Sequence, residues 1–341
     1  MTVFADIVNA SSATIEKHES IIRANLILVK RGSCMKEKFS YDEYLDLIEK
    51  DEGQANKYKS KFIPNQLYKY QPIGSGTMRT KRIQTIKKEE IWASRVKYLN
   101  DPFEFKMLYA NQDSDDIREF YEDVLNRNEI ICLSGKWNDK LMWAHYADSH
   151  TGMCVEYTFR DNHKGQVNPV TYVANRQNCD NELKTWLENK DRALEAMLKQ
   201  KRMDGIQRRQ LHASGKIMYT KDSVWKYEKE YRIVTRNHKD IESDMFDSYK
   251  NQKGSLHKIQ EFNFNISKVY LGMNCTEENR NKIIETIKVL NDIRVREAIG
   301  HSRKDKAIMY KVLEDMGMIA TVWQVYSDDK LKLRSRPITD N

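Results

Sequence analysis

Short runs of β-branched and aromatic residues recur along this chain, and they limit what it can fold into. Examples are QLYKY, IWASRV, EIICLSG and GMCVEYTF, which are separated by turn residues and amphipathic helical segments. In the last run, Met153, Val155, Tyr157 and Phe159 alternate onto one face of a strand. Regular strand–helix–strand alternation is missing, so the pattern predicts an α+β fold with small, twisted antiparallel sheets around a cleft.

The sequence predicts two regions of different character. Residues 1–60 are predicted to be a helical N-terminal extension, in which Ser40 caps a helix and Glu43 returns the bond as a capping box. The polar run DEGQANKYKSKF is interpreted as a linker or a helix end. Residues 66–335 are predicted to form the α+β domain.

Composition argues against several classes of protein. No apolar run approaches the roughly 20 residues that a membrane helix needs, and the first residues lack the pattern of a secretory signal. The five cysteines are scattered and form no C-x-x-C pair, which disfavours a disulfide scaffold and a zinc site. We therefore expect a cytoplasmic protein that has buried free thiols, no metal and no membrane partner.

Positive charge is concentrated in one segment. The chain carries a net charge of +8, and the segment from Lys184 to Lys239 holds fifteen Lys and Arg against seven Asp and Glu. Such a surface suggests a polyanionic partner such as nucleic acid, although a solvated helix face has the same composition. The residues predicted to contact a polyanion are Lys199, Lys201, Arg202, Arg208 and Arg209.

The stretch SVWKYEKEYRIVTR, residues 223–236, places carboxylates two residues apart. Its composition predicts a strand, so Glu228, Glu230 and Arg232 would lie on one face and the aromatic residues on the other. A charged edge strand that prevents aggregation is one explanation. We favour the other, in which the strand delivers a carboxylate into a cleft.

Two further stretches are dense in functional side chains. In LMWAHYADSHTG, His145 and Tyr146 share one face of a predicted helix. His145 is a candidate general base or hydrogen-bond donor to a ligand, and a structural histidine is the alternative. In NDPFEF, Asn100, Asp101 and Glu104 surround a proline-fixed turn that supplies too few oxygens for a metal site, so a turn capped by side chains is favoured.

Four segments in order carry a family resemblance: LYKYQ, IWASRVKYLNDPFEF, LSGKWNDKLMWAHYADSHTGMCVEY and WKYEKEYRIV. They resemble a widespread bacterial family, the domain of unknown function numbered twenty-nine seventy-one. The likeness extends over residues 66–335. The name of that family implies no activity.

A second resemblance concerns the order of elements. A strand LYKY, a helix, a strand IWAS and a late strand bearing E-x-E are together similar to the ADP-ribosyltransferase superfamily. There an Arg or His on an early strand, a Ser or Tyr on the next motif and a late Glu hold NAD. Carried over by position, Glu230 matches the catalytic glutamate and Ser94 the middle motif. Lys69 or Tyr70 stands where Arg or His is expected, which departs from the pattern.

The resemblance implies an NAD-dependent ADP-ribosyltransferase, a toxin or phage-defence effector that modifies nucleic acid or protein and has an antitoxin or regulatory partner. NAD is the substrate. The predicted catalytic residues are Glu230, Glu228 and His145, and the residues predicted to bind NAD are Lys69, Tyr70, Ser94, Asn100, Asp101, Tyr146 and Arg232. The alternatives are a non-enzymatic nucleic-acid-binding protein and a metal-independent nuclease that uses His145 with Glu230.

Overall fold

A large, mostly antiparallel sheet runs through the part of the chain that the structure describes, which is residues 38–109, 115, 128–180, 204–236, 253–300 and 305–338 of a computed structural model. Its strands follow the order β11-β2-β4-β1-β5-β12-β13-β14, with β10 beside β4 and β6 beside β10. β12 and β13 pair in parallel, and the other pairs in this sheet are antiparallel. The mixed α+β class that the sequence predicts is therefore confirmed.

The strands of this sheet are β1 (Gln66–Gln71), β2 (Glu90–Arg95), β4 (Asn128–Ser134), β5 (Met153–Phe159), β6 (Asn168–Pro169), β10 (Glu230–Arg236), β11 (Gly254–Lys258), β12 (Phe264–Leu271), β13 (Thr321–Ser327) and β14 (Leu333–Pro337). Two short parallel ladders pair β3 (Leu108–Tyr109) with β8 (Gln177–Asn178), and β7 (Thr171–Val173) with β9 (Thr220–Asp222).

The described α-helices are α2 (Tyr41–Lys50), α3 (Glu52–Ser60), α4 (Gly76–Lys87), α6 (Lys140–Tyr146), α8 (Gly205–Ser214), α10 (Glu277–Ile299) and α11 (Lys306–Asp315). Short 3-10 helices are η1 (Val96–Tyr98), η2 (Gly215–Tyr219), η3 (Ser223–Glu228) and η5 (Ile259–Phe262). Residues 1–37 of the predicted N-terminal extension and residues 184–203 of the basic segment lie outside the described residues. None of the described helices is both long and apolar enough to cross a membrane.

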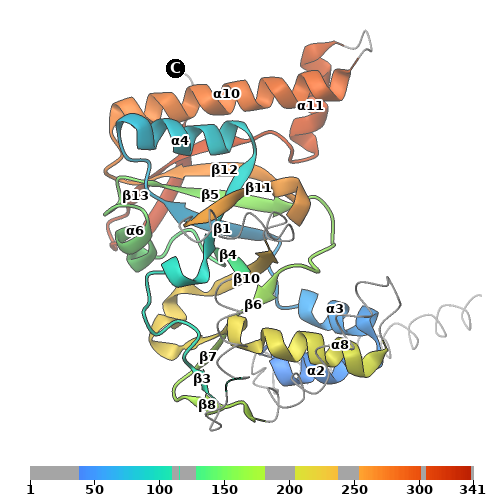
Figure 1. Cartoon of the computed structure of the whole chain (residues 1–341). Coiled ribbons are helices and arrows are strands. Elements are labelled where there is room, and N and C mark those ends of the chain that lie inside the picture. Colours follow the sequence, from blue (N-terminus) through green and yellow to red (C-terminus); the bar gives the residue numbers. More distant parts are fainter. Residues whose placement is uncertain are drawn as a thin grey trace, which may run out of the picture. The chain divides into compact units, whose positions relative to one another are not determined.

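The core lies on the face of the sheet that α4 and α10 cover, and Figure 1 shows these two helices side by side. The predicted alternation along β5 is confirmed, because Met153, Val155 and Tyr157 are all buried in this core. Ile86 of α4 and Ile287 of α10 are buried in the same cluster. Burial of such side chains stabilises the fold by roughly 1.5–3 kcal/mol each.

β4 is the branch point of the sheet. β10 pairs with β4 along its whole length, from Asn128 to Ser134. β1 and β2 therefore share the other edge of β4: β2 pairs at residues 129 and 130, and β1 pairs at Ser134. The separate small sheets predicted from the sequence are thus joined into one, because β4 contributes pairs to both halves.

The run interpreted as a linker or helix end forms a complete helix, α3. Asp51 caps it, with its Oδ1 accepting from the backbone N–H of Gln54 at 3.0 Å. Ser40 caps α2 as predicted, through a 3.3 Å bond from the backbone N–H of Glu43. The return bond of the predicted capping box is relayed, because Tyr58 accepts from the backbone N–H of Ser40 and donates to Glu43. Such a relay needs a residue from the following helix, which local spacing does not reveal.

Lys59 of α3 is a buried cation held by neutral groups. Its Nζ donates to the backbone carbonyl of Gly165 at 2.6 Å and to Asn168 Oδ1 at 3.1 Å. No carboxylate of the described residues forms an ion pair with it, and burial lowers the pKa of its amine to about 8. A lowered pKa in the folded state means that the ammonium form opposes folding.

We predict that the stability of the protein rises as pH increases from about 8 to 10.5, through the titration of Lys59. In this window the unfolded chain binds the proton and the folded chain does not, so raising the pH removes a penalty of about 3 kcal/mol. Lys59→Met should abolish this component, measured as the free energy of unfolding in urea at several pH values. The exposed Lys57→Met is the matched control, and a pH dependence that is the same in both variants would contradict the assignment.

Candidate functional site

A pocket of about 390 Å³ opens beside β4, where β1 and β2 share its edge. Between Ile130, which pairs with β2, and Ser134, which pairs with β1, that edge of β4 carries no strand partner. Cys132 lies between these two residues and lines the pocket together with them. The neighbouring Ile131 points to the opposite face and is buried in the core, as strand alternation requires.

Eight of the ten residues predicted from the sequence line this pocket: Lys69, Tyr70, Ser94, Asn100, His145, Tyr146, Glu228 and Glu230. They come from β1, β2, the turn after η1, helix α6, η3 and β10. Asp101 and Arg232 do not line it. Asp101 instead caps its turn, with Oδ1 accepting from the backbone N–H of Phe103 at 2.9 Å.

The strand predicted over residues 223–236 is wrong in its first half. Residues 223–228 form η3, and Lys229 then adopts a left-handed conformation with φ of 47° before β10 begins at Glu230. Glu228 and Glu230 nevertheless converge, because both carboxylates bind the same cation, Lys221. The convergence comes from this turn, and not from the alternation of a strand.

Glu230 is fully engaged by cations. Its Oε1 accepts from Arg232 Nε at 2.8 Å, and its Oε2 accepts from Arg232 Nη2 at 3.0 Å and from Lys221 Nζ at 3.1 Å. Burial alone would raise the pKa of Glu230, but the charges of Arg232 and Lys221 outweigh burial and lower it to about 2. Glu230 is therefore a permanently ionised carboxylate at neutral pH.

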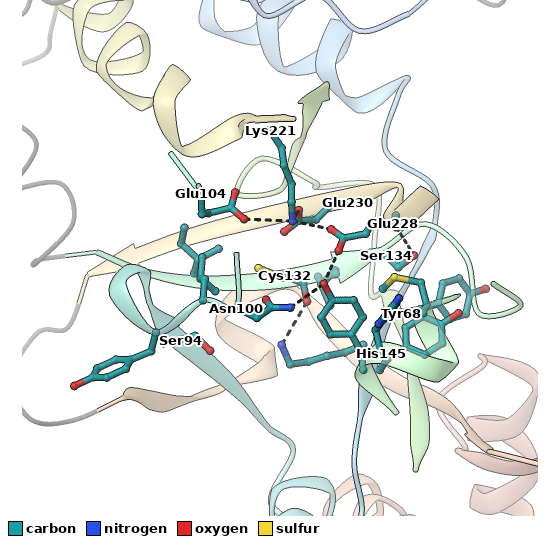
Figure 2. A pocket seen from close by; sticks show the side chains of 18 of the residues that line it. Tyr68, Ser94, Asn100, Glu104, Cys132, Ser134, His145, Lys221, Glu228 and Glu230 are labelled. Carbon is teal, nitrogen blue, oxygen red and sulfur yellow. Dashed lines mark hydrogen bonds and ion pairs between the residues drawn. The ribbon is translucent and has the colours of Figure 1, made fainter. Parts of the chain in front are cut away.

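Glu228 is bound differently. Its Oε1 accepts from the Tyr146 hydroxyl at 2.5 Å, and its Oε2 accepts from Lys221 at 2.7 Å. Burial and then the negative charge of Glu230 raise the pKa of Glu228. Asn100 donates to the Tyr146 hydroxyl at 3.2 Å, which completes a chain of hydrogen bonds from the turn to the carboxylate (Figure 2).

Two members of this ion network, Lys221 and Glu104, were not among the site residues predicted from the sequence. Lys221 of β9 also contacts Glu104, at 3.3 Å (Figure 2). Arg232 Nη2 contacts the other oxygen of Glu104 at 2.6 Å. All five side chains are at least 93% buried. Three carboxylates thus face two cations, and the excess is one negative charge when all are ionised. Because Glu228 has the raised pKa, it is the carboxyl that takes up a proton first.

The remaining predicted residues have distinct environments. Lys69 Nζ lies 3.4 Å from the carbonyl oxygen of Cys132, and burial lowers the pKa of this amine. The Tyr70 hydroxyl donates to the carbonyl of Lys136 at 2.9 Å, which holds the loop before α6. Ser94 Oγ accepts from the indole N–H of Trp92 at 3.0 Å. His145 is exposed at the mouth of the pocket.

The carboxylates that converge in the site are paired with cations of the protein itself. Among the described residues no group of three or more His, Cys, Asp or Glu side chains is arranged to hold a metal ion. The three carboxylates that do converge already bind Lys221 and Arg232, which take the place that a cation would occupy.

We predict that Glu230→Gln destabilises the fold at neutral pH by about 3 kcal/mol, because two buried cations lose their shared carboxylate. The folded pKa of about 2 lies below the ordinary 4.5, so the contribution is complete above pH 4.5 and is lost as pH falls toward 2. The difference in unfolding free energy between the wild type and the variant should therefore shrink over that interval. Glu285→Gln, an exposed carboxylate of α10, is the control. Equal stability of the wild type and Glu230→Gln at every pH would contradict this.

Part of the ion network lies in a region that matches a known family model. Residues 142–233 match the family model described as "Protein of unknown function (DUF2971)". No curated protein and no solved structure gives a significant match. The matched range contains His145, Tyr146, Lys221, Glu228 and Glu230, whereas β1 and β2 lie outside it. The resemblance to this family of unknown function is thereby confirmed over residues 142–233.

Proposed function

We propose that this protein is an NAD-dependent ADP-ribosyltransferase whose substrate enters the pocket beside β4. One observation carries the proposal: a single pocket gathers Lys69 of β1, Ser94 of β2 and the Glu228–Glu230 pair. These are the three positions that the resemblance to the ADP-ribosyltransferase superfamily implies for NAD. They are up to 161 residues apart in the chain, so their meeting does not follow from sequence proximity.

The charge of the pocket suits the chemistry. In ADP-ribosyl transfer the bond between ribose C1′ and the nicotinamide nitrogen breaks, and its electron pair leaves with nicotinamide. The ribose becomes cation-like, and an acceptor atom then bonds to C1′ and releases a proton. A fixed negative charge near C1′ stabilises this transition state more than the ground state. The excess negative charge of the ion network supplies that field.

The contacts favour roles for Glu230 and Glu228 that differ from those predicted from the sequence. Both oxygens of Glu230 are bound by Arg232 or Lys221, so we assign it the role of holding the cations in place. Glu228 has the raised pKa and a hydroxyl partner, Tyr146, that a ligand can displace. We therefore assign Glu228 the direct contact with the ribose and the uptake of the acceptor's proton.

The size of the pocket is compatible with part of the dinucleotide. A volume of about 390 Å³ is near the lower end of the roughly 300–1,000 Å³ that small-ligand sites span. Under this proposal the pocket holds the nicotinamide-riboside half, and the adenosine half lies toward the mouth. Tyr68, Tyr98 and Tyr146 supply the aromatic surface for a planar ring.

The two alternatives have weaker support. A nuclease that pairs His145 with Glu230 needs a carboxyl that exchanges protons near neutral pH, and a pKa of about 2 is unsuited to this. For binding through the basic segment, Arg209 is paired with Asp46 and Glu49, and Arg208 donates to backbone carbonyls of α2. Lys199, Lys201 and Arg202 lie outside the described residues. A role as a toxin or phage-defence effector stays a prediction.

We predict that Glu228→Gln lowers the rate of nicotinamide release from NAD on the order of 10²-fold, because the charge is lost while the shape is kept. The assay follows labelled nicotinamide released from NAD by the purified protein. In the wild type, release should fall with acidification at a pH above the ordinary 4.5 of glutamate, because the pKa of Glu228 is raised and the ionised form is required.

Glu285→Gln serves as the control for a neutralised surface carboxylate, and circular dichroism of every variant checks folding. A folded Glu228→Gln variant that releases nicotinamide at the wild-type rate would remove Glu228 from the mechanism. A wild-type protein that releases no nicotinamide, alone or with cell lysate as the source of acceptor, would refute the transferase proposal.

A further inference from the structure

We propose that the mouth of the pocket is a binding surface for single-stranded nucleic acid. As an assignment of the acceptor this inference rests on the proposed function, but as a binding site it requires no reaction with NAD. The surface is the aromatic rim, defined as Trp225 and Tyr227 of η3 together with His145 of α6.

The aromatic rim is a continuous row of rings that leads to the pocket. Ring centroids lie 6.0 Å apart between Trp225 and Tyr227, and 6.3 Å apart between Tyr227 and His145. The row continues to Tyr146, 6.4 Å from His145, whose hydroxyl binds Glu228 inside the pocket. A flexible chain with planar groups can therefore follow the row from the surface to the buried carboxylate.

The surface beside the rim exposes large apolar side chains to solvent. Val224 is 68% exposed and Leu141 is 48% exposed beside it. Leu141 and His145 are four residues apart on α6 and so share one face of that helix. These side chains are exposed because other residues of the same elements are buried: η3 turns Glu228 inward, and α6 buries Met142 and Trp143. Exposed apolar groups beside partly exposed rings of this kind indicate a binding site.

Charge around the rim identifies the class of partner. Lys226 and Lys229 flank Tyr227, and Lys136 and Lys140 lie on the neighbouring loop and at the start of α6, and all four are exposed. A 2.9 Å bond from the backbone N–H of Gly135 to the carbonyl of Lys229 holds that loop against the end of η3. The four lysines therefore lie on the segments that carry the aromatic rim and on the loop next to them.

The carboxylates near the rim are engaged elsewhere. Asp222 accepts from the backbone N–H of Val224 at 2.9 Å, and Asp139 caps α6 through Leu141 and Met142. The glutamates of the pocket floor are buried and bound to Lys221 and Arg232. The four exposed lysines near the rim therefore outnumber Asp139 and Asp222, the two partly exposed carboxylates beside it.

Cations together with partly exposed rings match nucleic acid better than they match an acidic protein. Lysines bind backbone phosphates, and aromatic side chains stack on bases, which every single strand exposes. A duplex hides the faces of its bases, so the stacking contribution requires an unpaired strand. An acidic peptide would satisfy the lysines only.

The test measures binding of a fluorescently labelled single strand, as DNA and as RNA, to the full-length protein by anisotropy without NAD. We expect binding that weakens steeply with salt. The double variant Trp225→Ala with Tyr227→Ala should lose affinity about tenfold or more, the scale of lost base stacking. His145→Ala changes an exposed side chain and should also weaken binding, which keeps the test valid if the double variant is unstable. Tyr310→Ala, an exposed ring of α11, is the matched control and should bind like the wild type.

The lysines are tested separately. Lys226→Glu with Lys140→Glu should weaken binding to all sequences and reduce the salt dependence, whereas Lys330→Glu on the β13–β14 turn should do neither. A duplex of the same sequence should bind more weakly than the single strand.

Three outcomes would overturn the inference. These are no binding by the wild type at low salt, rim variants that bind like Tyr310→Ala, and equal displacement of the strand by a polyglutamate peptide.

The proposed transferase activity is tested separately from this binding site. Wild-type protein that binds single strands through the rim but releases no nicotinamide from NAD would refute the transferase and retain this site. Nicotinamide release without single-strand binding would refute this binding site and retain the transferase proposal.

Discussion

The buried ion network of Lys221 and Arg232 with Glu104, Glu228 and Glu230 is the interaction on which the site depends. It joins β9, β10, η3 and the turn after η1. Charges with so little exposure are tolerated only when they are paired, and removing one partner leaves the others buried and uncompensated. These four segments must therefore reach their final positions together. Assembly of the ion network therefore gives the pocket both its shape and its charge.

Within this network the two neighbouring glutamates have opposite properties, although they are the same residue type. Glu230 binds two cations, which lower its pKa to about 2, whereas burial and the charge of Glu230 raise the pKa of Glu228. Lys229 separates them with a left-handed turn, so each carboxylate approaches Lys221 from a different element. Two carboxyl groups with separated pKa values are the arrangement that acid–base and electrostatic catalysis use.

The site also separates charge by depth. The buried ion network, in which carboxylates outnumber cations, lies at the floor of the pocket, while the aromatic rim and exposed lysines lie near its mouth. Under our two proposals this order has a function, because a polyanionic acceptor would bind outside while the cation-like ribose forms beside the floor. The hydroxyl of Tyr146 connects the two levels, since its ring belongs to the aromatic row and its oxygen binds Glu228.

The sequence by itself determined the α+β class, the positions of strands such as β1, β2, β4 and β5, the cap of α2, and eight of the residues that line the pocket. It did so because alternation and capping are local properties, as in β5 and α2. Only the tertiary structure decided the branch at β4, the 3-10 turn that orients Glu228, and the pairing of Lys221 with Glu104. These contacts join residues that are distant in the chain. No local pattern marks one lysine of a basic segment as buried, because the stability of its charge depends on carboxylates that folding brings to it.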